Sequence, residues 1–195
     1  KSTELRSLVE RLDVLDRSTI PEVEVVLHMF DDPSLSDLLE NAVADVDRFK
    51  VSPPFVLIAP GASPHRPGKR WPASSYAVLA RALSETGNKP VLIGTAAEAE
   101  IAQQITTQCG AAVNLTGRTT LLEVAALARP ASAAVGNDTG PMHLTSAVGC
   151  RSVVLFSSDS DPSLTAPRGA GVTVLQRRKL ADLAIDDVLA ALVCV

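Results

Sequence analysis

Residues 136–143 (GNDTGPMH) combine a tight turn with the start of a helix, and this combination can bind an anion. The backbone N–H groups of Thr139 and Gly140 are expected at the N-terminus of that helix, where the helix dipole adds about half a positive charge. His143 lies one turn further along and can donate to the same anion, with a purely structural histidine as the alternative. We therefore predict a phosphate or diphosphate site here. Asp138 has two interpretations, as the N-cap of the helix or as the partner of a sugar or ribose hydroxyl.

Residues 60–72 place small side chains first and cations afterwards. Small residues allow a ligand to approach the backbone closely, and Arg66, Lys69 and Arg70 then bring three positive charges within five positions. Because the chain as a whole has a net charge of −4, this basic cluster indicates a local anion, and phosphate is the common one. The alternative is a solvated loop with surface charges. The P-loop pattern G-x-x-x-x-G-K-[ST] is absent from the sequence.

Two pairs of residues have the spacing of a helix capping box, in which Thr and Glu side chains satisfy the first N–H groups of a helix. Thr95 with Glu98 is one pair, and Thr120 with Glu123 is the other. Glu98 has a functional alternative, because an acidic residue near this edge of a nucleotide-binding fold often accepts hydrogen bonds from a ribose diol. The sequence leaves both roles of Glu98 open.

Two further turns are less specific. Residues 116–119 contain one cation and either support the anion site or cap the next helix. Residues 157–162 are polar and short, and they either line the sugar end of a pocket or form an ordinary turn. A G-x-S-x-G nucleophile motif and a metal-ligand spacing are both absent from the sequence. Cys109, Cys150 and Cys194 are far apart, which predicts buried or idle thiols in a reducing compartment.

The stretches that contain candidate binding residues each follow an expected strand. Apolar periodicity predicts strands at 55–59, 90–93, 112–115, 131–135, 152–156 and 172–175, and helices at 75–85, 95–108, 120–128, 141–148 (with Gly149 as C-cap) and 185–192. Alternation of strands and helices over short links predicts an α/β fold with a doubly wound parallel sheet, similar to the Rossmann fold. Ligands of such sheets bind outside the carboxyl ends of the strands, where these loops lie.

Residues 1–50 differ from the rest, with many charges and no Gly. Their pattern predicts an amphipathic helix near residues 5–12, a short strand at 23–27 and a second helix from 31 to about 46. The chain begins at Lys1 without Met, which suggests a processed or excised piece of a longer protein.

Composition narrows the classes of protein. The 195 residues are 46% hydrophobic but only 3% aromatic, so we expect a core of Ala, Val, Leu and Ile between helices and sheet. The net charge of −4 argues against a general nucleic-acid binder. No apolar run approaches the roughly 18 residues of a membrane span.

Four stretches stand in an order and spacing that resembles a known family: residues 60–63 (PGAS), 69–72 (KRWP), 116–119 (TGRT) and 137–144 (NDTGPMHL). This family is glycosyltransferase family 9, the ADP-heptose:lipopolysaccharide heptosyltransferases and their relatives. Residues 156–162 resemble the family's segment after the penultimate strand region. The resemblance covers about residues 53–165, and the combination of the 69–72 and 137–144 stretches is specific.

The resemblance implies the C-terminal, donor-binding half of a two-domain GT-B glycosyltransferase. Residues 1–50 would be the interdomain connector and first helix, and residues 51–195 the nucleotide-sugar-binding domain. It implies an inverting enzyme that transfers heptose from ADP-heptose to lipopolysaccharide core or a related glycan. The location expected is cytoplasmic, with peripheral contact at the inner membrane surface as a further option. The partners expected are the nucleotide sugar and a glycan or lipid-linked acceptor, without nucleic acid.

The resemblance also implies roles for single residues. Lys69 and the turn at Asp138, Thr139 and Gly140, with His143, would hold the diphosphate and its sugar, and Lys69 would stabilise the leaving group. It implies that Glu98 meets the ribose and that Ser63 touches phosphate. It implies no metal and no cofactor. The catalytic base is expected in an N-terminal acceptor domain that this sequence does not contain.

The sequence also departs from the family pattern. Residues 64–68 are Pro-rich, and Ser157 and Ser158 stand where the family has Gly. Two other functions stay open on the sequence alone. One is a non-catalytic GT-B-like module for nucleotide binding or protein interaction, and the other is another nucleotide-sugar enzyme such as an epimerase.

Overall fold

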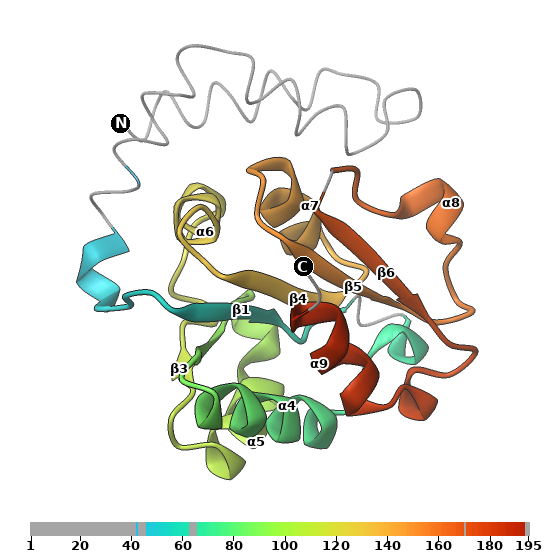
Figure 1. Ribbon diagram of the computed structural model, residues 1–195, viewed down its shortest axis with the longest axis horizontal. Helices are drawn as coiled ribbons and strands as arrows, with labels where there is room; N and C mark the ends of the chain where they lie inside the picture. The colour runs from blue at the N-terminus through green and yellow to red at the C-terminus, as the bar shows by residue number, and fades with distance from the viewer. Residues whose placement is uncertain (1–41, 43–45, 63–65, 170, 194–195) are drawn as a thin grey trace.

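The computed structural model describes residues 42, 46–62, 66–169 and 171–193, which form one six-stranded parallel sheet with helices on both faces (Figure 1). The strand order is β3-β2-β1-β4-β5-β6, so the chain reverses its direction of winding between β1 and β4. The strands are β1 (Phe55–Ala59), β2 (Lys89–Leu92), β3 (Val113–Asn114), β4 (Ala133–Asn137), β5 (Ser152–Phe156) and β6 (Val172–Gln176). All neighbouring pairs are parallel.

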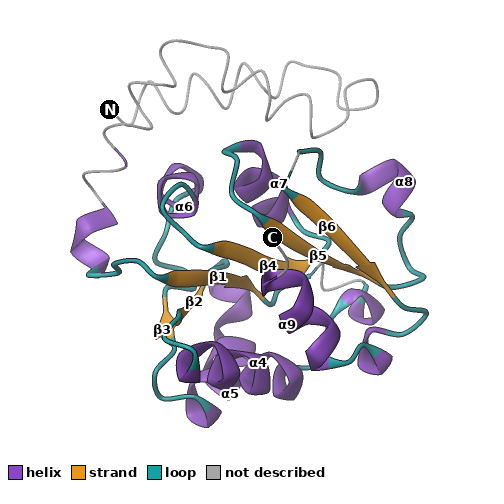
Figure 2. Ribbon diagram, viewed as in Figure 1, coloured by secondary structure: helices purple, strands orange, loops and turns teal. Residues whose placement is uncertain are grey.

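The helices form two layers (Figure 2). One core cluster packs α4 (Ala73–Glu85), α5 (Ala99–Gln108) and α9 (Ile185–Val193) on one face of the sheet. The other cluster packs α6 (Leu121–Ala128) and α7 (Gly140–Ala147) on the opposite face. Short elements complete the described chain: α8 (Pro162–Thr165) and the 3-10 turns η1 (Asp47–Phe49), η2 (Pro67–Lys69), η3 (Ala96–Glu98) and η4 (Leu180–Asp182).

The central strand β1 explains why a continuous apolar run becomes a buried parallel strand. Phe55, Leu57 and Ala59 contribute to one core cluster, whereas Val56 and Ile58 contribute to the other. All five residues are buried. A strand that is covered on both faces needs apolar side chains at every position, and this confirms the doubly wound sheet that the sequence predicted.

Several predicted boundaries differ from the structure. β4 lies two residues later than the expected 131–135, because Gly136 pairs with Ala59 and Asn137 pairs with Leu155 in the sheet. The expected helix at 95–108 is divided into η3 and α5. Gly149 is not the C-cap of α7. Val148 takes that position, and Gly149 follows with φ of 83°.

Several sequence predictions fall partly or wholly outside the described residues. The helix at 5–12 and the strand at 23–27 lie outside them, as does nearly all of the helix expected at 31–46. Cys109 and Cys150 are buried, as expected, whereas Cys194 is not described. Within the described part of the chain, no helix is both long and apolar enough to cross a membrane.

Candidate functional site

The Asp138 carboxylate is the meeting point of three elements at the carboxyl edge of the sheet. Lys69 Nζ, at the end of η2, donates a hydrogen bond of 2.6 Å to Asp138 Oδ2. His143 Nε2, from α7, lies 3.8 Å from Asp138 Oδ1. Thr165 Oγ1, from α8, donates a long hydrogen bond of 3.5 Å to Oδ2. Residues far apart in the sequence are therefore gathered on one carboxylate.

The electrostatics of Asp138 keep this carboxylate ionised. Only 6% of its side chain is exposed, and burial alone raises the pKa. The neighbouring His143, Lys69 and Ser160 groups outweigh burial and lower the pKa of Asp138 from 3.8 to about 2. Since the Lys69 side chain is only 12% exposed, the two opposite charges form a largely buried ion pair.

The N-terminus of α7 differs in detail from the sequence prediction. The N-cap is Thr139 and not Asp138, so the interpretation of Asp138 as the N-cap is wrong. The Thr139 side chain does not cap the helix, because its Oγ1 donates to the Asn137 carbonyl. Among the described residues, the backbone N–H groups of Thr139 and Gly140 have no hydrogen-bond partner. Donors of this kind at a helix N-terminus can bind an anion, and the anion site that the sequence predicted here stays a prediction.

Asn137 is a structural residue that the sequence analysis missed. It is fully buried at the end of β4, and its amide nitrogen donates to the Pro60 and Gly61 carbonyls at 2.9 Å each. Its amide oxygen accepts from the Trp71 N–H and the Tyr76 hydroxyl at 3.0 Å each. The side chain therefore ties the loop after β1 and the start of α4 to the strand that ends directly before Asp138. No local signal in the sequence indicated this role, because Gly136 and Asn137 are residue types typical of turns.

The predicted basic cluster does not converge on one point. Arg70 donates to the Ala62 carbonyl at 2.9 Å, and Arg66 reaches the Asp159 carbonyl at 3.5 Å. Only Lys69 is directed at Asp138. Of the three cations, the structure therefore brings only Lys69 onto Asp138, and the binding of an anion by the cluster stays a prediction.

Glu98 closes a capping box, as its spacing predicted. Its Oε2 accepts from the Thr95 N–H at 2.8 Å and from the Thr95 hydroxyl at 2.6 Å. Its Oε1 makes no hydrogen bond within the described residues and faces Gly61, where an added Cβ would lie 3.0 Å from it. The capping role leaves one oxygen of Glu98 available. The second box, Thr120 with Glu123, is also present.

The sequence comparison decides which family this site belongs to. The model of glycosyltransferase family 9 (heptosyltransferase) matches residues 29–189. The chain belongs to glycosyltransferase family 9. This match includes β1, η2 and α7, which carry the site.

The relatives of this family 9 chain are heptosyltransferases by name. It is 36% identical over 119 residues to lipopolysaccharide heptosyltransferase 2 of Escherichia coli (strain K12), a match that covers 58% of this chain and 34% of that protein. It is 33% identical over 128 residues to lipooligosaccharide heptosyltransferase 2 of Haemophilus influenzae, covering 63% and 36% of the two chains. The chain thus spans about a third of the length of these curated relatives.

Solved structures match over a larger part of the chain. The ADP-heptose lipopolysaccharide heptosyltransferase II of E. coli superposes with a TM-score of 0.70 and 31% identity, covering 78% of this chain and 50% of that one. A family 9 glycosyltransferase from Veillonella parvula gives a TM-score of 0.71 at 22% identity, covering 77% and 50%. The second likeness supports the fold alone.

Two polar atoms beside Asp138 are buried without a hydrogen-bond partner among the described residues, His143 Nδ1 and Ser160 Oγ. Ser160 favours the ionised form of Asp138 but makes no hydrogen bond of normal geometry. Buried polar atoms without partners are rare in folded proteins, and a functional role is one explanation for them. Ser63, which was also predicted to bind phosphate, lies outside the described residues.

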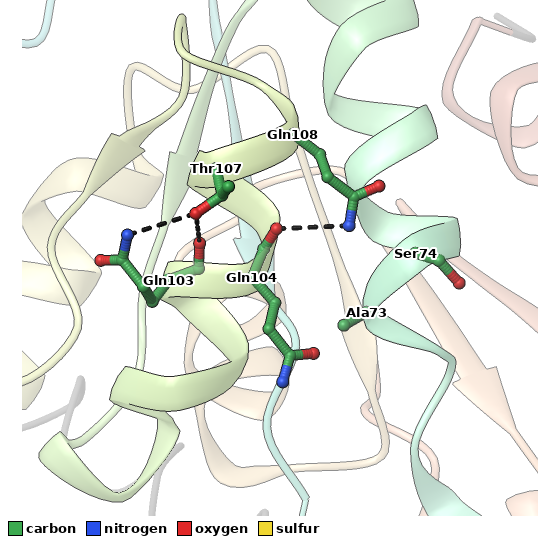
Figure 3. Close-up of a pocket in the computed structure, with 6 residues that line it drawn as sticks. All are labelled: Ala73, Ser74, Gln103, Gln104, Thr107 and Gln108. Atoms are coloured by element: carbon green, nitrogen blue, oxygen red, sulfur yellow. Dashed lines mark hydrogen bonds between the residues drawn. The ribbon is translucent and has the colours of Figure 1, made fainter.

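A separate surface hollow of about 550 Å³ contains none of the predicted site residues (Figure 3). It is lined by the first residues of α4 and by polar side chains of α5: Ala73, Ser74, Gln103, Gln104, Thr107 and Gln108. Gln103 and Gln108 donate to neighbours on α5 at 3.3 Å and 3.4 Å. Within the described residues, no group of three metal-ligating side chains comes together in this family 9 chain.

Proposed function

We propose that this chain is the donor-binding domain of an inverting glycosyltransferase. In the whole protein, it would serve the transfer of heptose from ADP-heptose to lipopolysaccharide core or a related glycan. Membership of family 9 and the names of the relatives support this proposal. The observation that carries it is the N-terminus of α7, which combines free backbone donors with an adjacent buried cation and histidine.

The diphosphate of the donor binds at the N-terminus of α7. The N–H groups of Thr139 and Gly140 are without partners in the described chain, and the helix dipole favours an anion there. His143 adds a side chain that is only 10% exposed and whose Nδ1 lacks a partner. Lys69 supplies the positive charge, and it exchanges part of its contact with Asp138 for a phosphate oxygen.

The nucleoside binds on the β1 and β2 side of the same edge. Glu98 accepts hydrogen bonds from the ribose hydroxyls through Oε1, while Oε2 stays in the capping box. Gly61 makes room for this arrangement, because a Cβ at that position would lie 2.7 Å from Glu98 Cγ. Ser63 contacts a phosphate, as the family resemblance implies.

Transfer proceeds by a single displacement at the anomeric carbon. The oxygen of an acceptor hydroxyl forms a bond to that carbon while the bond to the β-phosphate oxygen breaks, and the electron pair stays on the diphosphate. Lys69 and the α7 N-terminus stabilise the developing negative charge, which is the differential stabilisation that accelerates the reaction. The proton of the hydroxyl passes to a base in the acceptor domain. No metal or cofactor is required in this scheme.

The partners of the whole protein follow from the same proposal. They are a nucleotide-sugar donor and a glycan or lipid-linked acceptor, and nucleic acid is not among them. The reaction takes place on the cytoplasmic side of the inner membrane, with the protein in the cytoplasm or in peripheral contact with that surface.

Isothermal titration of the chain with ADP tests this function. We expect binding by the unaltered chain, and Lys69→Ala should weaken it by about 1–3 kcal/mol because a charged hydrogen bond to phosphate is lost. Lys89→Ala is the matched control, since Lys89 is the first residue of β2 and lies at the amino ends of the strands, away from the candidate site. Absence of ADP binding at millimolar concentration would overturn the proposal. An unchanged affinity of Lys69→Ala would remove Lys69 from the site.

A further inference from the structure

The loop between β5 and α8 presents a carboxylate that the fold does not use. The Asp159 carboxylate makes no hydrogen bond or ion pair with any described residue. Its backbone, however, is fixed, because the Asp159 N–H donates to Ser157 Oγ at 3.2 Å. The preceding Ser158 donates to the Arg178 carbonyl from its N–H at 3.3 Å and from its hydroxyl at 3.0 Å. The loop backbone is therefore held in place, and it carries an exposed carboxylate that is free to accept hydrogen bonds.

This carboxylate borders the candidate donor site. It lies directly against η2, since a Cβ added to Gly68 would be 2.2 Å from Asp159 Oδ2. Gly68 directly precedes Lys69 in the chain. In the β5–α8 loop, Asp159 is followed by Ser160, whose buried hydroxyl lies beside Asp138. Asp159 and Ser160 thus approach the Lys69–Asp138 pair from the β5 side.

The chemistry of a carboxylate limits what can bind beside it. An ionised carboxylate only accepts hydrogen bonds, and it repels phosphate. The ligand group next to Asp159 must therefore be a hydrogen-bond donor without negative charge. In the proposed function, the diphosphate of the nucleotide sugar binds to the α7 N-terminus and Lys69. The sugar is attached directly to the diphosphate, and its hydroxyl groups are such donors.

We infer that Asp159 is a sugar-binding residue that helps to determine which donor is accepted. Its carboxylate accepts hydrogen bonds from hydroxyl groups of the donor's sugar, and the Ser160 hydroxyl supplies a second contact. The inference rests on the proposed donor-binding function and deepens it, because it assigns the sugar to the β5–α8 loop.

Measuring the affinity for ADP and for ADP-heptose tests the role of Asp159 separately from the proposed donor-binding function. Asp159→Ala should weaken binding of ADP-heptose about tenfold or more. The same variant should bind ADP as well as the unaltered chain or somewhat more tightly, because a negative charge near the diphosphate is removed. Glu85→Ala is the matched control, since it removes an exposed acid at the far end of α4.

Gly68→Ala is an independent second variant. The added Cβ meets the end of the Asp159 side chain, so the carboxylate must turn away while the residue itself stays. We expect a loss of ADP-heptose affinity in the same direction as for Asp159→Ala. If neither chain variant changes ADP-heptose affinity, or if both ligands weaken equally, the inference is overturned. If the unaltered chain binds neither ligand, the proposed function itself fails.

Discussion

Two adjacent residues at the end of β4 have different roles: Asn137 holds the structure together, and Asp138 lies in the candidate site. The Asn137 amide makes four hydrogen bonds within the chain and has no further capacity for a ligand. Asp138 instead faces Lys69, His143 and Thr165, each from a different element. Because Asn137 is locked, the carboxylate that follows it has a fixed position relative to η2.

The ionisation of Asp138 has a measurable effect on stability. Its pKa is lowered from 3.8 to about 2 in the folded chain, so the native state favours the ionised form. The stabilisation is present above about pH 4 and is lost as the pH falls toward about 2. Urea midpoints across this range should therefore show an advantage over Asp138→Asn that shrinks with falling pH. A difference between the two proteins that is constant across the range would contradict the assigned pKa.

The sequence singled out the residues that meet at the carboxyl ends of the strands, but not their contacts. Lys69, Asp138 and His143 were found because they follow strands that end at the same edge of the sheet. The ion pair between Lys69 and Asp138 joins positions 69 residues apart, and no local spacing encodes it. The N-cap prediction failed for a related reason: it depends on where β4 ends, and pairing with β5 sets that point.

At the scale of elements, the approach of α7 to the sheet depends on one glycine in β4. A Cβ on Gly136 would lie 2.6 Å from the Ala59 carbonyl oxygen and 2.8 Å from Met142 Sδ. Ala59 is in β1 and Met142 is in α7, so Gly136 lets a strand and a helix close around the same point. This packing brings the loops after β1 and β4 together.

Gly136→Ala should therefore destabilise the chain by roughly 1–3 kcal/mol, the usual cost of overpacking a core. Gly110→Ala is the matched control, because a Cβ there has nothing within 4 Å. Thermal or urea unfolding of the two variants measures the difference. Equal stability of both would mean that the strand and helix adapt without cost.

The boundaries of a strand were predictable where helices cover both faces of that strand. β1 and β5 match the sequence prediction residue for residue, since a strand covered on both faces is a continuous apolar run between turns. β4 was displaced because its last residues, Gly136 and Asn137, are typical of turns and reveal their strand pairing only in three dimensions.

At the scale of the whole molecule, the sheet has a protected centre and weaker edges. β1, β4 and β5 have a paired strand on each side, whereas β6 ends the described sheet and has exposed residues along its length. At the other edge, β3 contributes only two residues, which are half-buried.

Hydrogen exchange should follow this arrangement. We expect amides of β1, β4 and β5 to exchange last, through global unfolding, and those of β3 and β6 to exchange earlier through local opening. Mass spectrometry of peptides from the intact chain measures these rates. Protection of β6 equal to that of β4 would show that another segment covers this edge.

The pairing of Lys69 with Asp138 also sets how a charged ligand would be captured. Because Asp138 neutralises the charge of Lys69, little positive field from this side chain extends into solvent. Lys69 therefore adds little to the long-range attraction of a diphosphate, whereas Arg66 and Arg70, which contact backbone carbonyls, keep their positive charges. The ionic-strength dependence of the association rate should then come from Arg66 and Arg70 more than from Lys69.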